Sequence, residues 1–276
     1  MTDHVVLAVD GAAPSLAAER WVVERSHRIA AEIEVTSVLE HAPLAAGFPD
    51  AERDRRRRRL DEVAARLRAA LPDAAVRAEL RHGRVVGELI AASASASVLV
   101  VGMTLVDTVD EVGHLPLGLR LAGRTHSVLV VVPTGFGAAG GSDVVVGWDT
   151  DAAGEAALAF AAREAQHAAS VLNIVRARKG ELPLDVELAA GRLRAGHPEA
   201  EVRVVHAVPP VASALLEAGR DASLIVVGSH GRNPLEDLLV GSVSEHVLAR
   251  SPIPVAVVPE PSEPIAVSPE IVDEDL

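Results

Sequence analysis

The stretch Ala222–Pro259 reads ASLIVVGSHGRNPLEDLLVGSVSEHVLARSPIPVAVVP and decides the fold of the chain. Leu224–Val227 form an unbroken apolar run that stops at Gly228, and Pro254–Val258 form a second such run. Runs of this kind are typical of strands that are buried on both faces of a parallel sheet. Between them, apolar residues recur at helical spacing until Pro252 ends the pattern. The stretch therefore predicts a strand, a glycine-containing loop, a helix and a further strand.

Three glycines, Gly228, Gly231 and Gly241, punctuate this segment. Glycine permits a positive φ or a close backbone approach that a Cβ atom would obstruct. Gly241 and Ser242 open the helix, and the first N–H groups of a helix are unpaired and carry a partial positive charge. Such a helix start suits a phosphate group, to which the hydroxyls of Ser242 and Ser244 would add donors. A tight strand-to-helix turn with a serine cap is the alternative interpretation.

The spacing of these residues resembles a family signature. Gly228-Ser229-His230-Gly231, followed after nine residues by Gly241-Ser242, resembles the G-x2-G-x9-G-[ST] motif of the ATP-binding universal stress proteins. The flanking sequences VVGSHGR and GSVSEHVL are also similar to that family. The resemblance implies ATP as the ligand. A Mg²⁺ ion that accompanies the phosphates would be held mostly by phosphate and water.

The composition limits the class of protein. The chain has 276 residues, enough for two domains with sizeable cores, and 49% of them are hydrophobic, as in a soluble globular protein. The net charge of -13 argues against nucleic acid as the main ligand. The chain contains no cysteine, which fits a cytoplasmic location. No apolar run approaches the length of a membrane span, so we expect no membrane partner.

Two similar segments follow one another along the chain. Val5–Asp10 (VVLAVD) matches Val144–Asp149 (VVVGWD) 139 residues later, and Val100–Gly102 matches Val226–Gly228 126 residues later. Self-similarity at this scale indicates tandem domains. The predicted domains are residues 1–138 and 139–259, and an acidic, proline-rich tail, residues 260–276, is expected to be disordered.

Strands and helices are predicted to alternate within each repeat. For the second repeat the predicted order is strand 144–148, helix 154–168, strand 171–175, helix 184–195, strand 202–207 and helix 211–218, before the segment quoted above. Alternation with short connections implies an α/β fold with a parallel, doubly wound sheet. The family resemblance further implies two tandem Rossmann-like (adenine nucleotide alpha hydrolase-like) domains. Each would be a five-stranded parallel sheet flanked by helices, with the first and fourth strands adjacent.

The resemblance also implies which residues bind the nucleotide. Asp149 would contact the nucleoside, and Ile174 or Val175 would meet adenine through main-chain groups. The other implied residues are Gly147, Gly228, Ser229, Gly231, Arg232, Gly241, Ser242, Val243 and Ser244. Ligands of such sheets bind at the carboxyl ends of the strands, where Asp149 and Gly228 are predicted to lie. A turn or helix-cap carboxylate is the alternative role for Asp149.

The first repeat departs from the signature where phosphate would bind. Leu105, Leu115 and Pro116 stand at the positions of Gly231, Gly241 and Ser242. Leucine side chains would intrude on the ligand, and proline has no N–H to donate. Asp107, Asp110 and Glu111 add negative charge that would repel phosphate. We therefore predict that this repeat does not bind ATP in the family manner. An alignment shifted onto Gly113 or Gly118 is the alternative.

An arginine run opens a predicted amphipathic helix in the first repeat. Arg55–Arg59 follow Arg53, and the apolar face behind them consists of Leu60, Val63, Leu67 and Leu71. The run is a candidate surface for an anionic protein partner. We favour a solvated face balanced by the neighbouring aspartates and glutamates.

The sequence offers no catalytic or metal-binding motif. It lacks the lysine-containing loop G-x4-G-K-[ST], the nucleophile motif G-x-S-x-G and the zinc motif H-E-x-x-H. No evident general base or arginine finger accompanies the glycine loop, so ATP hydrolysis should be slow at most. We hypothesise an ATP-binding regulator of a stress response that acts through nucleotide-dependent conformation or association. The alternatives are a nucleotide-independent interaction module and a slow ATP hydrolase.

The family resemblance also implies an association. Universal stress proteins pair through their last strands, which are predicted here at residues 127–132 and 254–258. The two repeats would pair within one chain as a pseudo-dimer, or two chains would form a homodimer.

Overall fold

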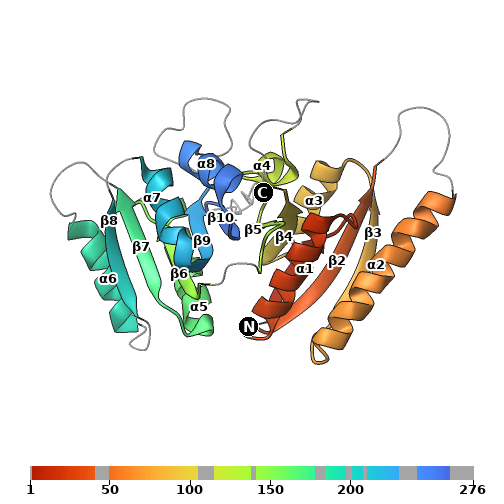
Figure 1. The fold of residues 1–276 in the computed structure, drawn as a ribbon, viewed down its shortest axis with the longest axis horizontal. Helices are drawn as coiled ribbons and strands as arrows, with labels where there is room; N and C mark the ends of the chain where they lie inside the picture. The colour runs from red at the N-terminus through yellow and green to blue at the C-terminus, as the bar shows by residue number, and fades with distance from the viewer. Residues whose placement is uncertain are drawn as a thin grey trace, which may run out of the picture.

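The computed structural model describes residues 2–40, 50–104, 115–137, 141–177, 184–196, 201–207, 210–229 and 241–261. Within these ranges, ten strands form one sheet, and helices cover both of its faces (Figure 1). The strand order is β3-β2-β1-β4-β5-β10-β9-β6-β7-β8. The first repeat supplies one half of this sheet and the second repeat supplies the other half.

The first repeat alternates strands and helices. In chain order its elements are β1 (Asp3–Ala8), α1 (Ala13–Ser26), β2 (Ala31–Leu39), α2 (Asp50–Ala70), β3 (Val76–His82), α3 (Val85–Ser93), β4 (Val98–Met103), α4 (Leu117–Leu121) and β5 (Val128–Pro133). Strands β1, β4 and β5 are rich in valine and leucine and are mostly buried, as strands with helices on both sides must be.

The second repeat has the predicted elements, each within two residues of the predicted bounds. They are β6 (Asp143–Gly147), α5 (Ala152–Ala168), β7 (Leu172–Ala177), α6 (Leu184–Gly196), β8 (Val202–Ala207), α7 (Val211–Ala218), β9 (Ala222–Gly228), α8 (Ser242–Arg250) and β10 (Val255–Val258). A local signal fixes the start of α5, because the carboxylate of its N-cap residue Asp151 accepts a hydrogen bond from the Gly154 N–H at 2.6 Å.

Both repeats follow the same topology. Strand β1 pairs in parallel with β2 and β4, and β6 pairs in parallel with β7 and β9. The prediction that the first and fourth strands are adjacent is therefore confirmed in each repeat. The strand order reverses at these pairs, which places a crevice at the carboxyl ends of β1 and β4 and another at those of β6 and β9.

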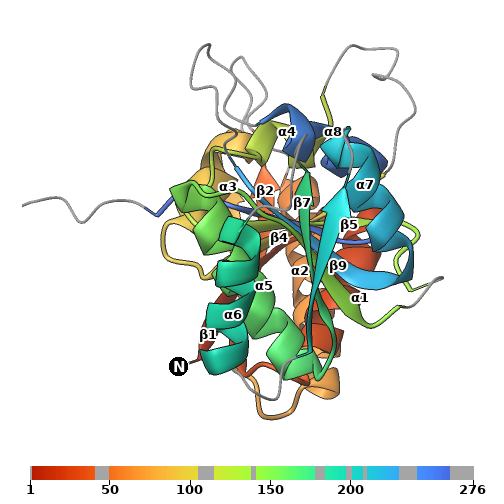
Figure 2. The same ribbon diagram turned by 90° about the vertical axis from the view of Figure 1, so that its left-hand side faces the viewer.

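The last strands of the two repeats join them. Strands β5 and β10 are antiparallel, with Val131 opposite Val255, Val130 opposite Ala256 and Leu129 opposite Val257. The predicted pairing within one chain is confirmed, and it merges the two five-stranded parallel sheets into one. Helices α4 and α8 lie side by side over this junction (Figures 1 and 2).

The core has two layers, one on each face of the sheet. Helices α1, α2, α5 and α6 pack on one face, and α3, α4, α7 and α8 pack on the other. The chain has few aromatic residues, so valine, leucine and alanine fill both layers. Trp21 and Trp148 are buried in the first layer.

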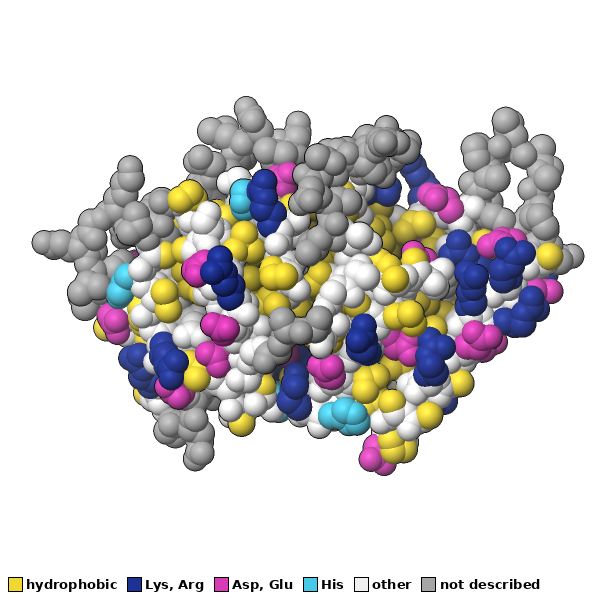
Figure 3. Space-filling model, in the orientation of Figure 1, with side chains coloured by type: hydrophobic (Ala, Val, Ile, Leu, Met, Phe, Trp, Pro, Cys, Tyr) yellow, Lys and Arg dark blue, Asp and Glu magenta, His cyan; other side chains and the backbone are white. Residues whose placement is uncertain are grey.

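Helix α2 carries the arginine run on its outer side. The predicted apolar face is buried, and Leu60 and Leu67 are fully inaccessible. Outside, Arg55 and Arg56 pair with Glu52. In the space-filling view, basic and acidic side chains lie side by side over this part of the molecule (Figure 3). These contacts support the interpretation of the run as a solvated, charge-balanced face.

Candidate functional site

A pocket of ≈ 160 Å³ lies at the carboxyl ends of β6 and β9, beside the start of α8. Seven of the residues that the resemblance implied are in its lining: Gly147, Asp149, Gly228, Gly241, Ser242, Val243 and Ser244. They come from three elements that are distant in sequence and meet where the strand order reverses. The fold thus assembles most of the predicted nucleotide-binding residues around one cavity.

Helix α8 begins at the edge of this pocket. Gly241 is its N-cap, with φ -64° and ψ 146°, and the Gly241 N–H donates to the Ser229 carbonyl at 3.0 Å. The Glu245 N–H donates to the Gly241 carbonyl at 3.0 Å as the helix ladder begins. The N–H groups of the three residues between them precede that ladder and carry the partial positive charge of the helix start. All three residues line the pocket, which suits an anion.

Close packing, rather than backbone torsion, explains why Gly147 and Gly228 are glycines. Neither Gly228 nor Gly241 has a positive φ. A Cβ atom on Gly228 would lie 3.1 Å from Ala153 at the start of α5, and one on Gly147 would lie 3.0 Å from the side chain of Leu215. Other residues can adopt the torsion of Gly241, so any requirement for glycine at that position comes from a molecule in the pocket.

The three predicted serines have different environments. Ser229 is buried, and its N–H donates to the Val258 carbonyl at 2.8 Å. Ser244 is also buried, and its hydroxyl donates to the Gly228 carbonyl at 2.7 Å, which ties α8 to the end of β9. Ser242 is exposed and lines the pocket. Ser229 and Ser244 therefore hold the loop ends together, whereas Ser242 remains accessible from the pocket.

An arginine that the sequence analysis missed forms the β7 side of the pocket. The side chain of Arg176 is 3% exposed, and its Nη1 atom donates to Asp149 Oδ1 at 2.6 Å and to the Trp148 carbonyl at 3.1 Å. Its Nη2 atom donates to Asp185 Oδ2 at 3.1 Å. The guanidinium carbon lies 5.0 Å from the centroid of the Trp148 ring, within cation–π range. Asp149, the predicted nucleoside contact, thus already balances a buried positive charge.

Two buried donors in this wall lack a partner among the described residues. They are the indole Nε1 of Trp148 and the Nε of Arg176. An unpaired buried donor costs about 1–3 kcal/mol, and buried polar groups are normally hydrogen-bonded. A bound polar molecule or an ordered water would satisfy these donors.

Ile174 and Val175 do not line the pocket. Ile174 is fully buried in the core between β6 and β8, and the β7 residue that lines the pocket is Arg176, two positions later. Val175 pairs with β6 and is also buried. Gly231 and Arg232 lie outside the described residues.

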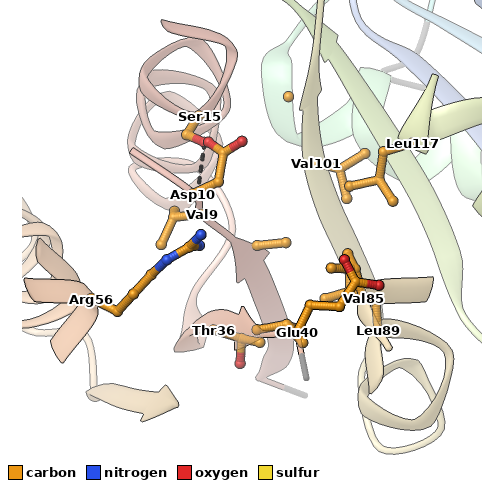
Figure 4. A pocket seen from close by; sticks show the side chains of 13 residues that line it. Val9, Asp10, Ser15, Thr36, Glu40, Arg56, Val85, Leu89, Val101 and Leu117 are labelled. Carbon is orange, nitrogen blue, oxygen red and sulfur yellow. Dashed lines mark hydrogen bonds between the residues drawn. The ribbon is translucent and has the colours of Figure 1, made fainter. Parts of the chain in front are cut away.

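The first repeat has a pocket at the equivalent place, at the carboxyl ends of β1 and β4. Its volume is ≈ 260 Å³, and Asp10 and Gly102 line it where the second pocket has Asp149 and Gly228. The Ser15 hydroxyl donates to Asp10 Oδ1, and Arg56 points from α2 toward Asp10 (Figure 4). A crevice is therefore present among the described residues of the first repeat. We predicted no ATP binding here, and that expectation stays a prediction.

The two pockets differ in the helix that comes after the fourth strand. Helix α4 has five residues, against nine in α8, and its N-cap is Pro116, which has no N–H. Leu115 beside it is 51% exposed. Gly118, the alternative alignment point, is buried, and a Cβ atom there would lie 2.9 Å from Val131. Gly118 is therefore required by packing against β5. Leu105, Asp107, Asp110, Glu111 and Gly113 lie outside the described residues.

Several residues of the second pocket escaped the sequence analysis. They are Trp148, Asp151, Gly154, Arg176, Val211, Leu215 and Val227. One signal was available, because Arg176 is the charged residue of β7 and lies near the carboxyl end of that strand. Gly154 is also required by packing, since a Cβ atom there would lie 2.2 Å from the Asp149 carbonyl oxygen.

Two further searches concern the described part of the chain. In that part, no three histidine, aspartate or glutamate side chains are grouped so that they could hold a metal ion. None of its helices combines the length and the apolar character needed to cross a bilayer.

Comparisons with known proteins give consistent matches. The model of the Universal stress protein family matches residues 1–111 and 148–259. A universal stress protein of Mycolicibacterium smegmatis is 29% identical over 92% of this chain and 96% of its own length.

Solved structures match as well. The crystal structure of a universal stress protein from Archaeoglobus fulgidus has a TM-score of 0.77 at 21% identity and covers 94% of this chain and 96% of that one. This likeness extends over both repeats and concerns the fold. A universal stress protein solved in complex with cAMP is 31% identical, covers 43% of this chain and 97% of that one, and has a TM-score of 0.36.

Proposed function

This chain belongs to the universal stress protein family, and from that premise we propose that its second repeat binds ATP and that the nucleotide regulates the conformation or association of the protein. One observation carries the proposal. Seven of the implied nucleotide-binding residues line a single pocket at the start of helix α8. The pocket joins an anion-binding helix end to a crevice between adjacent parallel strands, which is where such folds bind ligands.

The phosphates would lie at the start of α8. The N–H groups of Ser242, Val243 and Ser244 supply donors there without a lysine, and the accessible Ser242 hydroxyl adds another. Bound ATP would supply negative charge that these fixed dipoles stabilise. Gly231 and Arg232, which precede α8 in the sequence and lie outside the described residues, remain part of the proposal.

The nucleoside would lie toward β7, against the buried pair of Asp149 and Arg176. Arg176 already donates a hydrogen bond to Asp149 Oδ1. Asp149 would therefore accept a hydrogen bond from a ribose hydroxyl in addition to the one from this arginine. A main-chain contact from Ile174 would require a different arrangement of β7, so we assign the contact to Val175 or Arg176.

We propose a binding protein rather than an efficient enzyme. Among the described lining residues, Asp149 pairs with Arg176, Asp151 caps α5, and the Ser244 hydroxyl is bonded to the Gly228 carbonyl. A general base placed for attack on a phosphate is not among the described lining residues. Binding of ATP, alone or with Mg²⁺, would then act by ordering the crevice.

Titration calorimetry with ATP tests the proposal. We expect about one site per chain, and we expect ADP, AMP and cAMP to compete with graded affinity. Two sites would contradict the prediction for the first repeat, and no binding would favour an interaction module. A slow turnover of ATP that disappears in Asp149→Ala would promote the hydrolase alternative. Mass spectrometry of small molecules released from the purified protein would identify the resident ligand.

A further inference from the structure

A buried charge cluster connects α1 of the first repeat to α5 of the second. Arg25 is 1% exposed, and its Nη2 atom lies 2.7 Å from Glu164 Oε1 and 2.6 Å from Asp3 Oδ2. Its Nε atom also donates to both carboxylate oxygens of Glu164 at 3.1 Å. Burial alone would lower the pKa of the Arg25 guanidinium, but Glu164 and Asp3 raise it above its ordinary value. Arg25 is therefore a charged group that two carboxylates hold inside the junction.

The two charges occupy the same position in the two repeats. Arg25 and Glu164 are 139 residues apart, which is the separation of the matching segments Val5–Asp10 and Val144–Asp149. Their neighbours match too, since Trp21 corresponds to Phe160 at the same separation, and each ring lies within 6 Å of an arginine guanidinium. A residue that contacts its own counterpart lies on the local two-fold axis.

The strand junction shows the same axis. Val130 of β5 lies opposite Ala256 of β10, and these residues are themselves counterparts 126 residues apart. Strands β5 and β10 are apolar and alike, with sequences VLVVVP and VAVV. Either strand would pair with a second copy of itself about as well as with the other. The strand sequences therefore hardly discriminate between the pairing of two identical repeats and the pairing of a first repeat with a second repeat.

The charged pair supplies that basis. If the first repeats of two chains met through β5, the axis would bring Arg25 against a second Arg25. If two second repeats met through β10, it would bring Glu164 against a second Glu164. Like charges in a buried contact are costly, because desolvation is not offset by attraction.

We propose that the Arg25–Glu164 pair makes the junction accept one repeat of each kind, so that the chain closes on itself and does not join other chains through like repeats. The proposal concerns association alone and does not depend on nucleotide binding. Asp3 belongs to the first repeat and would stay beside Arg25 in either arrangement, so it reduces the cost of two Arg25 side chains meeting. It does not replace Glu164, which accepts three hydrogen bonds from Arg25 and comes only from a second repeat.

Cross-linking of a single engineered thiol tests the proposal, because the chain contains no cysteine. Glu24 is exposed and lies with Glu164 in the lining of a cavity at the junction. A Glu24→Cys chain carries one thiol, so a bismaleimide links two chains at this position when two first repeats pair. Asp61→Cys on the outer side of α2 reports random encounters. Each protein is refolded from denaturant at high concentration, so that repeats can choose their partners.

In the protein that keeps Arg25 and Glu164, we expect Glu24→Cys to give no more cross-linked dimer than the Asp61→Cys control gives. With Arg25→Leu and Glu164→Leu, we expect at least tenfold more, because the charge discrimination is gone while the contact remains packed. A mirrored variant, Arg25→Glu with Glu164→Arg and Asp3→Asn, should return to the control level. Circular dichroism verifies refolding, and Met at both positions replaces Leu if the leucine variant does not refold.

Two results would overturn the proposal. One is an apolar variant that refolds but yields no more cross-linked dimer than the protein with the natural Arg25–Glu164 pair. The other is a mirrored variant that cross-links as strongly as the apolar one, because opposite charges would then have no role. As a control for the loss of an ion pair in general, Glu19→Gln with Arg66→Gln removes a 2.7 Å pair between α1 and α2, within the first repeat, and should leave cross-linking unchanged.

Discussion

The two crevices of this molecule occupy the same place in two copies of one fold, yet they present different chemistry. In the second repeat a nine-residue helix begins at Gly241 and directs backbone donors at the cavity. In the first repeat a five-residue helix begins after Pro116, which has no donor. The shared fold sets where a ligand can bind. A few residues after the fourth strand then determine whether backbone donors are available there for an anion.

The larger cavity is not the one for which nucleotide binding is proposed. The first pocket is the larger, at ≈ 260 Å³ against ≈ 160 Å³. Trp148 and Arg176 line the second pocket, and the first repeat has the smaller Val9 and Ser37 at the corresponding positions. Cavity volume alone therefore does not distinguish the proposed nucleotide site, and the available hydrogen-bond donors are the better criterion.

The largest effect should come from Gly102, near the carboxyl end of the fourth strand of the first repeat. A Cβ atom on Gly102 would lie 2.0 Å from the Pro14 carbonyl oxygen, whereas one on its counterpart Gly228 would lie 3.1 Å from Ala153. We expect Gly102→Ala to destabilise the protein by about 3 kcal/mol and Gly228→Ala by about 1 kcal/mol. Urea unfolding measures both. Equal effects would show that the two strand ends approach their helices alike.

The next effect concerns binding. Gly241→Val should weaken ATP binding by about 100-fold, or about 2.7 kcal/mol, because a branched side chain would project where phosphate must approach the backbone. The fold should be unaffected, since valine can adopt a φ of -64°. Titration calorimetry and a thermal melt measure the two quantities.

The first repeat provides the matched control for that experiment. Leu115→Val changes the counterpart of Gly241 and should leave the ATP affinity and the number of sites unchanged. Normal ATP binding by Gly241→Val would show that the start of α8 is not the phosphate site.

A smaller effect is expected for the arginine that fills the second pocket. Arg176→Ser, which installs the residue found at the corresponding position of the first repeat, removes hydrogen bonds to Asp149 and Asp185. Both carboxylates are about one-third exposed, so water compensates in part, and we expect a loss of about 1–2 kcal/mol in unfolding free energy. Ser37→Ala, which removes no ion pair from the buried counterpart position, should cost less than Arg176→Ser. A neutral Arg176→Ser would show that the ion pairs contribute nothing net.

The smallest effect is a pH dependence confined to the first repeat. Burial alone would raise the pKa of the Glu34 carboxyl, but hydrogen bonds from Arg77, Thr36 and Arg81 lower it below its ordinary value of 4.5. The counterpart of Glu34 in the second repeat is Asn173, which does not titrate.

A lowered pKa in the folded state stabilises the protein above the ordinary pKa. We therefore expect Glu34→Gln to lose about 1 kcal/mol at pH 7 and the difference from the natural protein to shrink as the pH falls below 4.5. Urea unfolding across that range measures the difference. A constant difference at all pH values would assign the loss to packing. Asn173→Asp provides the comparison in the second repeat.

Much of the fold could be predicted because its signals are local. Apolar runs such as Leu224–Val227, and turn residues such as Pro252, fixed strands and helices to within two residues. The internal repeat indicated that one topology occurs twice. The sequence did not decide between pairing within a chain and pairing between chains, because β5 and β10 are apolar and similar and suit both arrangements.

The candidate site could be predicted only where it follows the motif. The motif located the start of α8, but it contained no information about Trp148 and Arg176, which reach the pocket because β6 and β7 are neighbours in the sheet. The inward contact of Ser244 with Gly228 was likewise hidden, since a serine in the first turn can face either the ligand or the backbone. Side-chain direction across strands is a tertiary property.

The position of β10 in chain order has a consequence for biosynthesis. Strand β5 is complete early, but the strand that covers its apolar edge is the last described strand of the molecule. A ribosome-bound or prematurely terminated chain that ends before Val255 therefore presents Val128–Val132 as an open edge to other nascent chains. Truncation within the second repeat should consequently leave β5 without its partner strand even though the core of the first repeat is intact, and the buried charge of Arg25 would oppose the pairing of two such edges.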